Sequence, residues 1–159
     1  MKKLTILTGV IMLIYACSGN TENKETAKNK DAVSDLFKED AASKELEAKG
    51  IGKFQNVELS DKLDVEMAKH GSDVYDLKCS SCHRLTDEKL VGPGWKDVTV
   101  RRKPEWIMNF SVNTDEMITN DPQAQAMLEE CLVRMPNQNL SDDEARQVLE
   151  FMRKNDGIK

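Results

Sequence analysis

Aromatic side chains make up only 5% of this 159-residue chain, and basic residues are outnumbered by acidic ones. A hydrophobic fraction of 39% with so few aromatics is thin for a core filled by side chains alone, so we expect a bulky apolar cofactor to supply part of it. The 23 basic and 28 acidic residues give a net charge of −5, which argues against a nucleic-acid partner. The length fits one domain with an additional segment.

The N-terminus lacks an apolar run long enough to span a membrane. Two lysines precede an apolar stretch over residues 4–15, and Ala16 then precedes Cys17. A spanning helix needs about 20 apolar residues, whereas a basic start, a short apolar stretch and a small residue are typical of an export signal. Residues 13–17 resemble the lipobox of bacterial lipoproteins. We expect residues 1–16 to be a signal peptide and Cys17 to be lipidated; a plain secretory signal with a coincidental cysteine remains the alternative.

The next segment lacks the side chains that a core requires. Residues 18–31 contain no Ile, Leu, Val or aromatic residue, so they cannot bury enough surface to fold. We interpret residues 17–49 as a flexible polar tether with a root-mean-square span of roughly 30 Å. Residues 50–159 then form the folded domain, with a core over residues 64–155 and a more apolar start that could lie on it as an extended arm.

One motif carries the chemistry. Cys79-Ser80-Ser81-Cys82-His83 has the C-x-x-C-H spacing of covalent haem attachment, in which both thiols form thioethers and the adjacent imidazole faces the iron. A thioredoxin-like pair would need a βαβ setting, and a zinc site would need a second pair of ligands. A plain disulfide would leave His83 unexplained. The motif therefore predicts one haem c with His83 as an iron ligand.

The second iron ligand is predicted to be Met135. It lies 52 residues beyond His83 in a stretch without helical periodicity, and Pro136 stiffens the backbone after it. Met paired with His is a common ligand set of electron carriers. The other candidates suit other roles: Met108, Met127 and Met152 suit the core, His70 suits solvent, and Met117 is undetermined.

Residues 64–155 resemble a class I monohaem cytochrome c domain, as found in bacterial lipoprotein cytochromes c. The resemblance rests on Gly71 before the haem motif, Gly92-Pro93 after it, and Met135 ahead of an amphipathic terminal helix. It implies an all-α fold of about four to five helices around one covalently bound haem. It also implies that the Pro93 carbonyl accepts a hydrogen bond from His83, and that Gly71 permits a close crossing by the terminal helix near Phe151.

Local signals place four helices. Helices are expected over about residues 64–77, after Pro104, and from Asp121-Pro122 to about residue 132. The last helix starts at a capping box, Ser141 with Glu144 three residues on. Its apolar face recurs at helical spacing through Ala145, Val148, Leu149 and Met152.

The expected function is single-electron transfer by a membrane-anchored carrier in the extracytoplasmic cell envelope (periplasm), cycling its haem between Fe(II) and Fe(III). The chain would exchange electrons with a respiratory reductase or oxidase through its haem edge, with no small-molecule substrate. Alternatives are a peroxidase-like or sensing haem protein with an open iron site, and a haem subunit fixed in a larger complex. Basic residues near the expected haem edge could steer an acidic partner, or could be solvated or neutralise haem propionates: Lys78, Arg84, Lys89, Lys96, Arg101, Arg102, Lys103 and Arg134. Cys131 is expected to be buried.

Overall fold

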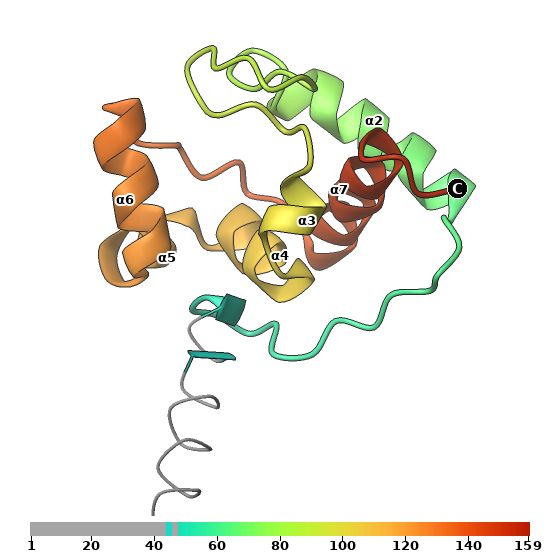
Figure 1. Cartoon of the computed structure of the whole chain (residues 1–159), viewed down its shortest axis with the longest axis horizontal. Coiled ribbons are helices and arrows are strands. Elements are labelled where there is room, and N and C mark those ends of the chain that lie inside the picture. Colours follow the sequence, from blue (N-terminus) through green and yellow to red (C-terminus); the bar gives the residue numbers. More distant parts are fainter. Residues whose placement is uncertain (1–43, 46–47) are drawn as a thin grey trace, which may run out of the picture. The chain divides into compact units, whose positions relative to one another are not determined.

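The computed structural model describes residues 44, 45 and 48–159 (Figure 1). The predicted signal peptide 1–16, Cys17 and most of the predicted tether 17–49 lie outside the described residues. No helix in the described part of the chain is both long and apolar enough to cross a bilayer.

The domain is built from helices joined by long irregular segments. From residue 50 onward, the structure has six helices: α2 Val65–Lys78, α3 Val98–Arg101, α4 Pro104–Val112, α5 Thr114–Asn120, α6 Pro122–Cys131 and α7 Asp142–Asn155. Over these residues the only β-type pairing is an isolated bridge between His83 and Lys89. The all-α prediction is confirmed. The two helices beyond the four placed above are short: α3 is a single turn, and α5 follows α4 after a break at Asn113.

Three of the helices begin directly after a residue whose side chain caps the first turn. Asp64 accepts a hydrogen bond from the Met67 N–H at 2.9 Å and begins α2. Asp121 does the same for the Ala124 N–H at 2.8 Å, ahead of Pro122 at the first turn of α6. The predicted capping box at the start of α7 is present in both directions. Such caps satisfy N–H groups that the first turn of a helix leaves unpaired.

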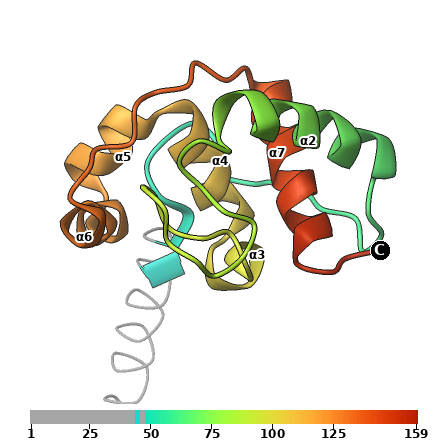
Figure 2. The same ribbon diagram turned by 90° about the horizontal axis from the view of Figure 1, so that it is seen from above.

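The first and last helices cross closely at Gly71 (Figures 1 and 2). A Cβ atom on Gly71 would lie 2.0 Å from the Gln147 carbonyl oxygen and 2.9 Å from the Phe151 Cβ, so no larger residue fits without moving a helix. The apolar face of α7 is buried here, with Val148 and Leu149 among its members. The close crossing near Phe151 is therefore present as expected.

Residues 50–63, here called the arm, run without helix along the domain and are fixed by buried polar side chains. Fully buried Asn109 of α4 accepts a hydrogen bond from the Phe54 N–H at 2.9 Å and donates to the carbonyls of Phe54 (2.9 Å) and Lys49 (3.1 Å). Glu105 accepts from the Val57 N–H at 3.0 Å. These bonds replace the backbone pairing that an extended segment would otherwise lack. The arm thus packs on the domain, and the proposed boundary at residue 50 stays a prediction.

Candidate cofactor site

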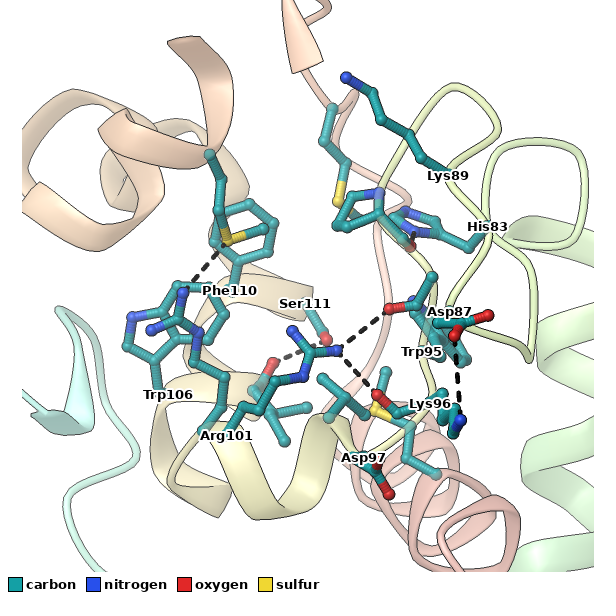
Figure 3. Close-up of a pocket in the computed structure, with 18 of the residues that line it drawn as sticks. His83, Asp87, Lys89, Trp95, Lys96, Asp97, Arg101, Trp106, Phe110 and Ser111 are labelled. Atoms are coloured by element: carbon teal, nitrogen blue, oxygen red, sulfur yellow. Dashed lines mark hydrogen bonds and ion pairs between the residues drawn. The ribbon is translucent and has the colours of Figure 1, made fainter. Parts of the chain in front are cut away.

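The haem motif opens onto a cavity of about 480 Å³. In Figure 3, His83 and Trp95 lie on one side of it, Trp106 and Phe110 on the other, and Arg101 reaches in between them. A smaller, mainly apolar cavity of about 80 Å³ is lined by Cys82 and again by His83. The two cavities share His83 in their lining, and the larger one is in the size range of ligand and cofactor sites.

The two cysteines of the motif lie at the C-terminal end of α2. Cys79 is the C-cap of this helix, and its carbonyl accepts the N–H groups of Cys82 (3.0 Å) and His83 (2.9 Å), which fixes the motif as one tight turn. Both cysteines are free thiols. Burial, more than the neighbouring Cys82, raises the pKa of Cys79 to about 11. The thiol is therefore protonated at neutral pH and inert as a nucleophile until a base or a bound group acts on it.

His83 is held in one tautomer by Pro93. Its Nδ1 lies 2.9 Å from the Pro93 carbonyl oxygen, and a carbonyl can only accept, so Nδ1 carries the proton. Burial lowers the pKa of His83, with the carbonyl acting in the opposite direction. Gly92 lies so close beneath the ring that a Cβ would be 2.4 Å from Cε1. The result is a neutral, fixed imidazole with its Nε2 lone pair free to bind a metal.

Met135 lies in the irregular segment between α6 and α7 and lines both cavities together with His83. Met108 and Met117 are buried in the core, and His70 is exposed on α2. Met127 also lines both cavities, which its helical setting did not indicate. Its sulfur, however, accepts a hydrogen bond from Arg102 at 3.7 Å, whereas no such partner engages Met135 among the described residues.

Aromatic rings form the walls of the larger cavity. Trp106 and Phe110 of α4 stack with centroids 5.0 Å apart, and Trp95 lies 5.4 Å from the His83 ring. The sequence indicated a helix after Pro104 but not that this helix faces the cofactor. The i, i+4 spacing of Trp106 and Phe110 places both rings on one face of the helix, and this spacing is the feature of the sequence that points to a shared aromatic wall.

Cationic groups gather at one margin of the larger cavity. Arg101 donates to the carbonyls of Gly94 (3.1 Å) and Lys96 (3.0 Å), which turns its guanidinium toward the cavity (Figure 3). Arg102 lies over the Trp106 ring at 4.7 Å. Burial, with the charge of Arg101, lowers the pKa of Arg102.

These residues fit a haem. Flat aromatic walls suit an apolar macrocycle, two free thiols beside a neutral imidazole suit covalent attachment, and the arginines suit its carboxylates. Cys79, Cys82 and His83 would hold the group, and Pro93 orients His83 through its carbonyl. Met135, which lines both cavities, is the predicted second ligand.

Comparison with known proteins agrees with this arrangement. The chain matches the cytochrome c family over residues 68–156, and it belongs to that family. It therefore binds haem c covalently, and haem-based electron transfer is its general activity. No curated protein sequence matches it significantly.

Solved structures of cytochromes c from Rhodothermus marinus share the fold. One is 36% identical, with a TM-score of 0.67 over 70% of this chain and 96% of that one. An engineered form, Rma TDE, is 35% identical with a TM-score of 0.66 and the same coverage. The same engineered protein bound to a carbene intermediate, at 36% identity and equal coverage, gives 0.64. The resemblance to a class I monohaem cytochrome c is thereby confirmed.

Proposed function

We propose that the chain is a membrane-tethered electron carrier whose iron is held by His83 and Met135, and not an enzyme. The observation that carries this proposal is the placement of both side chains on the same two cavities, with His83 fixed by Pro93. The haem supplies a one-electron couple. With His83 and Met135 both bound to the iron, no position would be open to a small molecule, which disfavours the peroxidase-like alternative.

The rigid surroundings of His83 support rapid transfer. The Tyr75 hydroxyl donates to the His83 carbonyl at 2.8 Å, and the Tyr75 ring lies 5.0 Å from Trp95. A ligand fixed on several sides moves little between oxidation states, which keeps the reorganisation cost of electron transfer low. Covalent attachment through Cys79 and Cys82 would add to this fixation.

The setting of the protein is also a proposal. Residues 1–16 read as an export signal and Cys17 as a lipidation site, which would put the haem domain outside the cytoplasm of a bacterium. The tether would keep it at the membrane near a quinol-oxidising complex and a terminal reductase or oxidase. A subunit fixed in a larger complex is the alternative, and migration of the detergent-solubilised protein alone on size exclusion would argue against it.

Replacement of Met135 tests the ligand assignment. In oxidised holo-protein, Met135→Ala should abolish the weak long-wavelength absorption band expected of methionine-ligated haem, and should lower the reduction potential because the sulfur ligand favours Fe(II). Met127→Ala is the matched control, since this side chain lines the same cavities. Loss of the band in Met127→Ala but not in Met135→Ala would assign the ligand to Met127.

A further inference from the structure

The single-turn helix α3 is held at its N-terminus by a side chain from the last turn of α7. The Asp156 carboxylate accepts the Asp97 N–H at 2.7 Å and the Thr99 N–H at 2.9 Å, and the Thr99 hydroxyl donates to it at 2.7 Å. Asp97 is the N-cap residue of α3 but makes no side-chain cap bond itself. Because four residues are too few for a helix to be stable alone, α3 depends on Asp156 for its place.

Both residues that meet in this contact are in unfavourable positions. Asp156 is the C-cap of α7, where the negative end of the helix dipole disfavours a carboxylate. Asp97 has φ 57°, a left-handed conformation that favours glycine. The hydrogen bonds to α3 compensate both costs, so the contact between α7 and α3 explains why an acid stands at position 156. Local strain of this kind points to a role for the segment that it holds.

Helix α3 carries the arginine that reaches into the larger cavity. Arg101 is the last residue of α3, and its guanidinium donates to two backbone carbonyls of the segment before the helix, at 3.1 and 3.0 Å (Figure 3). Asn155, next to Asp156, donates to the Leu85 carbonyl at 3.0 Å and so holds the segment that follows the haem motif. The end of α7 therefore fixes the cationic margin of the cavity, although neither Asn155 nor Asp156 lines the cavity itself.

We propose that Asp156 is a positioning residue for electron transfer: it holds α3 so that the Arg101 guanidinium stays at the cavity margin and raises the reduction potential of the haem. This deepens the proposed function, on which it rests. A cation beside the haem favours Fe(II), because that state carries one positive charge less than Fe(III). Asp156 acts through Arg101, and its own negative charge has the opposite effect on the potential.

Redox titration of the holo-protein against a dye of similar potential tests the sign of this effect. One electron passes from the reduced dye to Fe(III), which leaves the oxidised dye and Fe(II). At a fixed dye ratio, Asp156→Ala should lower the ratio of reduced to oxidised protein about threefold, since water screens the released arginine. Loss of the acid alone would raise that ratio. Asp73→Ala, which removes an exposed acid from α2, is the matched control and should not lower it.

A double variant shows whether the effect passes through Arg101. Arg101→Gln should lower the ratio of reduced to oxidised protein by about the same factor, and Asp156→Ala added to it should lower the ratio no further. An equal further fall would show that Asp156 acts in another way and would overturn the proposal. An unchanged or raised ratio in Asp156→Ala with Arg101 intact would also overturn it. If the wild type takes up no electron reversibly, the proposed function itself is wrong.

Hydrogen exchange of the holo-protein gives a readout that does not depend on the iron couple. The Thr99 amide should exchange at least about tenfold faster in Asp156→Ala than in the wild type, whereas the Val148 amide of α7 should keep its rate. Equal Thr99 rates would overturn the proposal. If Asp156→Ala melts below the assay temperature, Asp156→Asn retains one acceptor oxygen and should show both changes to a smaller extent. A wild-type titration and a wild-type Thr99 rate in Asp156→Asn would then overturn the proposal.

Discussion

Gly71→Ala should destabilise the domain strongly, although alanine is the better helix former. The new Cβ would lie 2.0 Å from the Gln147 carbonyl oxygen, where such a contact needs about 3.3 Å, so α2 and α7 would have to separate by roughly 1.3 Å. That opens the packing of Tyr75 against Phe151, whose rings are 5.4 Å apart. Overpacking of this severity costs about 3 kcal/mol, and the gain in helix propensity returns about 1 kcal/mol.

The net loss of about 2 kcal/mol corresponds to a fall of about 10 °C in the thermal midpoint of a domain this size. Circular dichroism of the oxidised holo-protein measures it. Ser72→Ala, the next residue of α2, gains helix propensity without the clash and should be equal to or slightly more stable than the wild type. If Gly71→Ala melts at or above the Ser72→Ala midpoint, the close crossing does not constrain this position and the reasoning fails.

Three further predictions concern the ligand, the charge network and the arm. Gly92→Ala should displace the His83 ring, since a Cβ would lie 2.4 Å from Cε1, and an absorption spectrum identical to wild type would contradict this. For Glu150, burial raises the pKa, but hydrogen bonds from two arginines and a backbone N–H outweigh it and lower the pKa below its usual 4.5. The stabilisation by the Glu150 carboxylate is therefore present above pH 4.5 and is lost as the pH falls through the lower pKa that Glu150 has in the folded protein. Glu150→Gln should cost about 3 kcal/mol in urea unfolding at pH 7 and progressively less below pH 4.5. A cost that does not change with pH would refute this role of the Glu150 charge. Asn109→Leu should leave arm N–H and carbonyl groups unpaired, cost about 2–4 kcal/mol and speed proteolysis of the arm, and unchanged cleavage would count against the role of Asn109.

The parts of the fold that the sequence predicted depend on neighbours in the chain. A capping box and apolar periodicity predict α7 because both are properties of one helix. The tight turn of Cys79 to His83 is likewise local. The sequence does not predict helix α5, because its seven residues show little apolar periodicity. Met117 of α5 is buried partly through contact with the arm, whose Ile51 N–H donates to the Met117 sulfur at 3.0 Å.

The walls of the site depend on contacts between distant segments. Met127 and Met135 differ little as residues, and only the fold brings both to the same cavities and places Arg102 on one of them. The sequence does not predict that Asn109 is buried, because asparagine is usually exposed. Its hydrogen-bond partners are backbone atoms more than fifty residues away in the chain.

The arm connects the predicted tether to the wall of the haem site. Gly50 has φ 71°, and a Cβ there would meet the Met117 side chain at 2.7 Å and the Trp106 ring at 2.9 Å. Trp106 in turn lines the larger cavity and donates its indole N–H to buried Asp121 at 3.2 Å. The backbone where the tether is proposed to end therefore packs against a side chain that shapes the cofactor pocket. Because the arm and the pocket share Trp106, a change that loosens the arm should also loosen the pocket.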